Sequence, residues 1–264
     1  MFPQHGPVDC RRCFENASQS VKFFDENQFR LLSPPAAYGA HNPVIAVLGM
    51  TYGSTQNAIS TEFDEQKAFA GMRDRLDKLL RRVGIFRDSD HCNAKLRAEE
   101  RDFHFGSVIR CSLMARDKEK EARQTKTAID PYSGESSLVI PAFQDRKQAS
   151  ATLRNCADVH LRALPDRLRL VILLGNSDAY VSAIRRQLQR LYPFDYKRLG
   201  RKAHFAAGRN WVHLTHPSKG NYAFYDKYLD DPPTEPQGIA REEAIAIIQR
   251  TDWRRHLSEA ALSA

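Results

Sequence analysis

The sequence has no apolar run long enough to cross a membrane, and this absence sets the first limit on what the chain can be. A membrane-spanning helix needs about 20 consecutive apolar residues. The N-terminal residues Met-Phe-Pro-Gln-His-Gly also lack the apolar core of a secretory signal peptide. Internal repeats and low-complexity segments are absent as well. We therefore expect a cytoplasmic protein, a monomer, with no membrane among its partners.

Cysteine is scarce, with five residues among 264. Thiols stay reduced in the cytosol, so disulfides are a poor explanation for them. Four of the five nevertheless form an informative pattern: a Cys10-x-x-Cys13 pair, Cys111 at the end of an apolar run, and Cys156 in a predicted helix. A C-x-x-C pair can place two thiolates on one metal ion or cluster edge, and two distant cysteines can complete the site. Cys92 has no such partner, and we interpret it as an ordinary, partly buried cysteine.

Acidic residues are fewer than basic residues. Lys and Arg number 40 against 32 Asp and Glu, which gives a formal net charge of +8. A basic balance suits a polyanionic partner, because cationic side chains neutralise phosphates and release counterions. It equally describes a protein with a solvated cationic surface, so charge alone does not identify nucleic acid as the partner.

Apolar runs alternate with amphipathic stretches along the chain. Continuous apolar runs are typical of strands buried on both faces of a parallel sheet, and an apolar stripe at helical spacing predicts a helix that packs on such a sheet. The predicted strands cover residues 44–48, 103–111, 168–174 and 211–214. The predicted helices cover residues 64–84, 145–164, a stretch that begins at Ser177 or Asp178, and 241–257.

This alternation predicts an α/β protein, a three-layer α/β/α sandwich around a central, mainly parallel four-stranded sheet. Residues 1–264 form a single domain in this interpretation. Residues 112–150 are strongly charged, and we interpret them as an insertion with little capacity to form a core. In such sheets ligands bind at the carboxyl ends of the strands, where the loops after Leu48 and Leu214 lie.

Four segments, in order with the four cysteines, carry a resemblance: Val44–Met50, His104–Cys111, Leu168–Ala179 and Trp211–Ser218. Together they resemble the uracil-DNA glycosylase superfamily, most closely its iron–sulfur branch, from about Cys10 to Tyr225. That branch has a C-x-x-C before the first strand, a cysteine ending the second strand, and another in the helix before an "LG..A" strand. The resemblance implies a [4Fe–4S] cluster held by Cys10, Cys13, Cys111 and Cys156. Structural zinc is the alternative.

The resemblance also implies DNA as the partner, with the target nucleotide extruded into a pocket and its base removed. His216 matches the motif histidine that stabilises the departing base. Pro217 and Ser218 match the loop that presses on the DNA backbone, and Lys219 beside them is a candidate phosphate contact. Basic residues of the 112–150 segment are further candidates for facing DNA.

The first active-site motif of the family follows the strand predicted at residues 44–48, and this chain departs from it there. Met50 stands at the glutamate position of the iron–sulfur branch and Thr51 at the Asp or Asn position of other branches, so neither supplies a carboxylate. Gln56 or Asn57, with Thr51, is the predicted holder of the attacking water. The candidate base-binding residues are Gly49, Met50, Tyr52, Phe63, which falls at the position of the stacking aromatic, and Ser107, which falls at the position of the pyrimidine-reading asparagine.

Three functions remain open from the sequence. The first is a DNA glycosylase of base-excision repair with an altered first motif and uracil as the default base. The second is a catalytically silent member of the same superfamily that binds DNA. The third is a zinc-stabilised α/β protein unrelated to DNA. The first two differ only in the chemistry of the loop from Met50 to Asn57.

Overall fold

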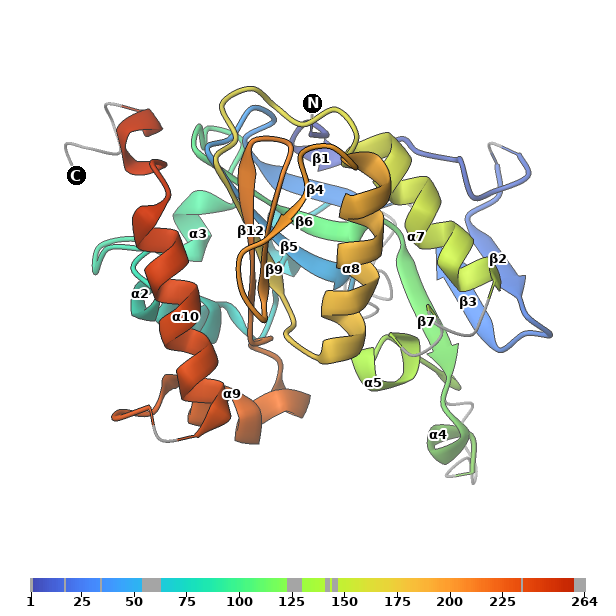
Figure 1. The fold of residues 1–264 in the computed structure, drawn as a ribbon. Coiled ribbons are helices and arrows are strands. Elements are labelled where there is room, and N and C mark those ends of the chain that lie inside the picture. Colours follow the sequence, from blue (N-terminus) through green and yellow to red (C-terminus); the bar gives the residue numbers. More distant parts are fainter. Residues whose placement is uncertain are drawn as a thin grey trace.

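A computed structural model describes residues 2–16, 18–33, 35–53, 63–122, 130–140, 143, 147–233 and 235–258. Within these residues the strands form an eight-stranded and a four-stranded sheet (Figure 1). The eight-stranded sheet has the order β1-β4-β6-β5-β9-β12-β11-β10. Its strands are β1 (Gly6–Pro7), β4 (Ala36–Gly39), β6 (Phe103–Ile109), β5 (Ile45–Thr51), β9 (Leu170–Leu174), β12 (Arg209–Leu214), β11 (Ala203–Ala206) and β10 (Lys197–Arg198).

The middle of this sheet is parallel. β5 pairs in parallel with both β6 and β9, and β9 pairs in parallel with β12. The outer strands are antiparallel, since β4 pairs with β6 and β11 with β12 in that sense. The predicted α/β class is confirmed. The predicted width of four strands is wrong, because short antiparallel strands with weak sequence patterns extend the sheet at both edges.

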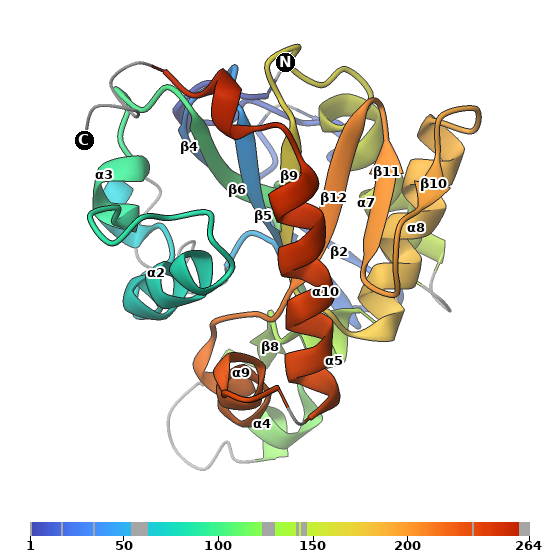
Figure 2. The ribbon, with the colours of Figure 1, turned by 60° about the vertical axis from the view of Figure 1, so that its left-hand side comes forward.

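Helices lie on both faces of the large sheet (Figure 2). Along β5, Ala46 and Leu48 join one buried apolar cluster, whereas Ile45 and Val47 join the other. The helices are η1 (Glu65–Lys67), α2 (Arg73–Arg82), α3 (Cys92–Lys95), α4 (Lys118–Ala122), α5 (Ser136–Val139), α7 (Lys147–His160), α8 (Asp178–Leu191), η2 (Lys219–Asn221), α9 (Tyr222–Leu229), α10 (Pro236–Arg250) and η3 (Arg254–His256). Helices α7 and α8 supply the first cluster, and α2 and α10 the second.

The helix predicted over residues 64–84 is interrupted. Asp64 caps only the short η1, by accepting a hydrogen bond from the Gln66 N–H (2.8 Å). Phe69 and Gly71 then take positive φ values of 53° and 73°, which a right-handed helix does not tolerate, so α2 begins at Arg73. The predicted end is confirmed, since Gly84 has a φ of 73° just beyond α2.

Residues 112–150 contribute more core than predicted. The second sheet has the order β2-β3-β7-β8 and consists of β2 (Val21–Phe24), β3 (Phe29–Leu32), β7 (Ser112–Arg116) and β8 (Tyr132–Ser133). Leu113 and Val139 are fully buried in the same apolar cluster as Leu31. The prediction of an insertion with little core is therefore wrong. Its apolar residues pack against an N-terminal hairpin about 80 residues earlier in the chain, as in the Phe29–Ala115 pair.

Candidate functional site

His216 lies just beyond the carboxyl end of β12. The Ser218 N–H donates to its Nδ1 (3.2 Å), and the Asn221 side chain donates to its carbonyl oxygen (2.9 Å). Burial, with a smaller contribution from the Arg75 cation, lowers the pKa of His216 to about 4. The imidazole is therefore neutral at physiological pH. Because Nδ1 accepts a hydrogen bond, the ring proton resides on Nε2, and the ring is a donor at that atom.

Arg75 of α2 fastens the loop that carries His216. Its Nε donates to the Pro217 carbonyl and its Nη1 to the Tyr222 hydroxyl. The guanidinium also lies over the Tyr222 ring, 4.6 Å from the centroid. Sequence reasoning missed Arg75, because its partner carbonyl lies 142 residues away and no local pattern marks the pairing.

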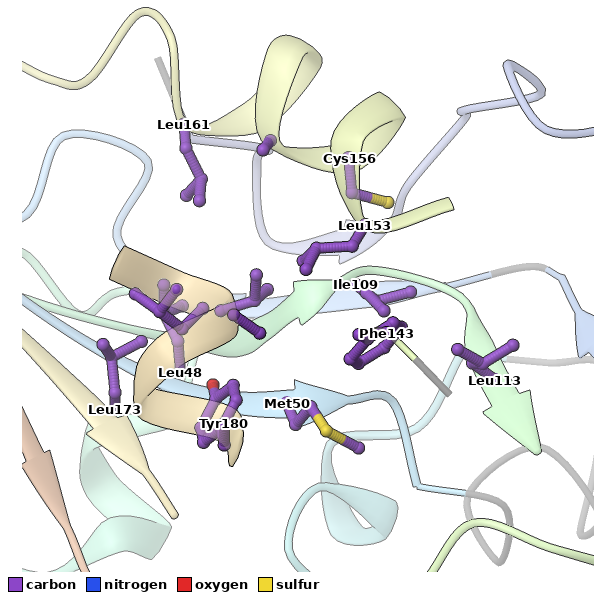
Figure 3. Close-up of a cluster of buried hydrophobic side chains, with 14 of the residues drawn as sticks. Leu48, Met50, Ile109, Leu113, Phe143, Leu153, Cys156, Leu161, Leu173 and Tyr180 are labelled. Carbon is purple, nitrogen blue, oxygen red and sulfur yellow. The ribbon is translucent and has the colours of Figure 1, made fainter. Parts of the chain in front are cut away.

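The first-motif residues are largely built into the fold. Met50 is buried in the apolar cluster and lies near Phe143 in Figure 3. The Thr51 hydroxyl donates to the Cys111 carbonyl (2.9 Å) and accepts from the Leu113 N–H (2.8 Å). These bonds join the end of β5 to the start of β7. They use the hydroxyl proton, so Thr51 cannot donate that proton to a water in this arrangement. Gln56 and Asn57 lie outside the described residues.

An aromatic group stands beside the end of β5. The Tyr52 and Tyr38 hydroxyls are hydrogen-bonded (2.8 Å), and Phe63 stacks on Tyr38 with centroids 5.3 Å apart. His5 packs edge-on against Phe63 at 5.0 Å. Its Nδ1 accepts from the Gly39 N–H (3.2 Å), so its Nε2 donates to Glu65 (2.9 Å). The structure thus brings two predicted residues, Tyr52 and Phe63, together with partners that sequence reasoning missed.

The remaining predicted base- and DNA-binding residues differ in how far they are buried. Ser107 is buried opposite Gly49, and its hydroxyl donates to the Ile109 carbonyl of its own strand (2.7 Å). Pro217 is buried and Ser218 is half-buried. The backbone of Lys219 begins η2, and its side chain lies outside the described part of the structure.

A cavity of about 680 Å³ lies beside the residues that contact His5 and the His216 loop. Its lining includes Glu65, which binds His5, and Arg75, which binds the His216 loop. Neither His216 nor Phe63 is part of the lining. The cavity therefore borders the candidate site but is not lined by its predicted catalytic or base-stacking residue. The site is assigned from the contacts of His216 instead.

Three of the four predicted cysteine ligands belong to one apolar region, with Cys111 and Cys156 inside the cluster and Cys13 packed against it. Cys111 follows β6, Cys156 lies in α7, and both are buried, whereas Cys10 and Cys13 are half-buried in an N-terminal turn. Burial raises the pKa of the Cys111 thiol, and the Cys156, Cys13 and Cys10 thiols add to that rise. Burial likewise raises the pKa of Cys156 to about 12, with contributions from Cys13 and Cys10. The pKa values of Cys111 and Cys156 thus depend on thiols in other segments of the chain.

A neighbouring amide contacts one of these thiols. The Asn155 side chain donates to the Cys13 sulfur (3.6 Å). Among the described residues, which include all four of these cysteines, no group of three His, Cys, Asp or Glu side chains is arranged so that it could hold a metal ion. Cys92 is apart from this group, fully buried in the other apolar cluster, and thus more enclosed than predicted.

Comparisons with known proteins do not place the chain in a family. No protein family profile matches the sequence, and a search of curated proteins finds no significant match. Among the described residues, no helix combines the length and the apolar character that a membrane crossing requires.

Proposed function

We propose that this protein is a DNA glycosylase of the uracil-DNA glycosylase type. It hydrolyses the N-glycosidic bond of a damaged base in DNA, with uracil as the default. The observation that carries the proposal is the state of His216: a neutral imidazole at a strand end, with Nδ1 occupied by the Ser218 N–H and Nε2 left as the donor. A fixed neutral donor is suited to stabilise an anion that develops next to it.

The sheet order supports this site. The finer fold in the proposal is a three-layer α/β/α sandwich whose parallel centre has the order β6-β5-β9-β12. The chain leaves β5 toward β6 on one side, while β9 and β12 lie on the other. In open α/β sheets, ligands bind at the carboxyl ends of the strands where the order reverses in this way. The loop that follows β5 begins at that point.

The chemistry required is modest. Cleavage of the bond gives the sugar oxocarbenium character and leaves negative charge on the base. The His216 Nε2–H donates to the base oxygen as that charge develops, without giving up its proton. Because the Thr51 proton is committed to the Cys111 carbonyl, the water is assigned to Gln56 or Asn57, as the sequence predicts. Phe63 presents an aromatic surface on which the extruded base stacks, next to Tyr38.

The cysteine group fits a metal centre in its donor chemistry. Thiols from three segments lie in or beside one buried apolar cluster, and thiolates are ligands of zinc and of iron–sulfur clusters. In the proposal, Cys10, Cys13, Cys111 and Cys156 hold a [4Fe–4S] cluster. When bound, the cluster supplies a structural cross-link. Its four ligands attach the N-terminal turn to the end of β6 and to α7.

A catalytically silent DNA-binding protein is the second candidate, and the first motif favours it. Met50 is buried in the core, and the Thr51 hydroxyl joins β5 to β7, so these two positions serve the fold. A glycosylase with these residues must obtain its water-holding group from elsewhere in the loop. We therefore expect any cleavage to be well below the rate of a relative with a carboxylate there.

A single-turnover assay tests the proposal. Excess protein is incubated with oligonucleotides containing uracil, hypoxanthine or xanthine, and abasic sites are then cleaved and counted. His216→Ala should lower the rate constant by about 10²–10³, the usual effect of removing one donor to a developing anion. DNA binding by the variant should be unchanged. The matched control is His41→Ala, which removes an exposed histidine from a loop.

One outcome would contradict the glycosylase activity, and another would contradict the role of His216. Normal DNA binding without cleavage of any tested base would favour the silent DNA-binding protein. Cleavage at equal rates by the wild type and His216→Ala would leave the glycosylase proposal in place, but would show that another group stabilises the departing base.

A further inference from the structure

Arg110 is a buried arginine between β6 and the second sheet, 1% exposed. It folds back over its own strand at Gly106. A side-chain carbon at Gly106 would come within 2.3 Å of the Arg110 Nη1, so the glycine makes room for the guanidinium. The Phe2 ring covers the group, with its centroid 5.5 Å from Cζ. The protein thus encloses a cation that is shielded from bulk water.

The only hydrogen-bond partner of this guanidinium in the described structure is uncharged. Nη1 contacts Nε2 of His104 (3.2 Å), a fully buried ring whose Nδ1 donates to the Ala40 carbonyl (2.9 Å). The carbonyl can only accept, so Nδ1 carries the ring proton and Nε2 accepts from Arg110. The bond therefore supplies no negative charge to balance the arginine.

The other edge of the guanidinium has no partner among the described residues. Both Nε and Nη2 are buried without a hydrogen bond, and none of the described carboxylates forms an ion pair with Arg110. A buried, unpaired charge is strongly destabilising, so proteins rarely retain one without a compensating anion. Arg241 illustrates the usual solution, since that fully buried arginine pairs with Asp231 (2.8 Å) and Glu242 (2.8 Å).

Cysteines are among the groups that interact with Arg110. Arg110 directly precedes Cys111, which lies with Cys156 in one buried apolar cluster, and its guanidinium interacts electrostatically with Cys156 and Cys10. One turn after Cys156 on α7, His160 is also buried with Nε2 unpartnered. Thiols lose their protons when they bind metal. Four thiolates outweigh the positive charge of one zinc ion or of a cluster core, so the loaded centre is an anion.

We propose that Arg110 is the internal counter-charge of the cysteine centre, and that its Nε and Nη2 donate hydrogen bonds to the sulfur ligands once metal is bound. This inference rests on the metal centre of the proposed function and does not depend on glycosylase activity. Arg110 is a positioning residue here: it holds no metal, but it stabilises the anionic loaded state over the empty one.

The test compares three variants of the metal-loaded protein. Arg110→Met removes the charge while retaining an unbranched side chain, Arg110→Lys retains the charge, and Arg241→Met is a matched control at a buried arginine that already has acidic partners. Metal affinity is measured by competition with a chelator, alongside iron, sulfide and zinc content. Arg110→Met should lower affinity by about 10–100-fold, whereas Arg110→Lys and Arg241→Met should leave most of it intact.

Two further measurements separate a counter-charge from a packing role. If the centre is a cluster, its midpoint potential should become more negative in Arg110→Met, because the reduced cluster carries more negative charge. In protein stripped of metal, Arg110→Met should raise the melting temperature, since it removes an unpaired buried cation. Arg241→Met should lower it, because that arginine donates to the Tyr228 and Asp230 carbonyls (3.1 and 2.8 Å).

The outcomes that overturn the inference are distinguishable. Absence of bound metal in both the wild type and Cys13→Ser would remove the metal centre, and this inference with it. Metal that is lost in Cys13→Ser but bound as tightly by Arg110→Met as by wild type, at an unchanged potential, would leave the centre standing and refute the counter-charge. A lower melting temperature of stripped Arg110→Met would show an ordinary structural role, such as bonding to an enclosed water.

Discussion

At the scale of single residues, the site depends on which atoms of each side chain are already engaged. His216 has Nδ1 occupied and donates from Nε2, whereas the Thr51 hydroxyl is engaged as donor and acceptor. The motif His-Pro-Ser was recognisable in the sequence, because it follows a predicted strand. The engagement of Thr51 was not, because its partners Cys111 and Leu113 lie about 60 residues away.

The ionisation of His216 predicts a distinctive pH dependence. Burial lowers its pKa to about 4, so the ring is already neutral well below physiological pH. The single-turnover rate constant should therefore be level between about pH 5.5 and 8. A protonated general acid with an ordinary histidine pKa of about 6.5 would instead lose rate as the pH rises through that value. Rates at saturating protein, with binding measured at each pH, decide between the two, and a decline above about pH 6.5 would refute the neutral donor.

At the scale of elements, structure that depends on a local sequence pattern could be predicted, whereas structure that depends on long-range pairing could not. The apolar runs of β5 and β9 identified central strands, and Ser177 caps α8 as expected by accepting from the Tyr180 N–H. The second sheet was missed because Phe29 pairs with Ala115, and nothing in either short segment indicates the other. Long sequence separation likewise hid Arg75 and His5, whose partners come from other elements.

The cysteine centre makes a prediction about the elements it connects. Anaerobically purified protein should be brown and contain iron and sulfide, and Cys13→Ser should lose both. The N-terminal turn should then be cleaved faster in limited proteolysis, because its attachment to Cys111 and Cys156 is lost. Cys92→Ala is the control, since Cys92 lies in the other apolar cluster and its loss should leave the iron in place. Colourless protein with stoichiometric zinc would reject the cluster but keep a metal site.

At the scale of the whole molecule, the net charge of +8 predicts that DNA binding weakens as the salt concentration rises. Each phosphate contact releases counterions, so affinity should fall linearly with the logarithm of salt concentration. Lys219→Ala should reduce that slope by about one unit if Lys219 makes one phosphate contact. Lys197→Ala is the control, because this exposed residue lies on the edge strand β10. Equal slopes for Lys219→Ala and wild type would remove Lys219 from the interface. Undetectable binding to single- and double-stranded DNA would argue against both DNA-directed functions, and would favour a metal-stabilised α/β protein whose charge is a solvated surface.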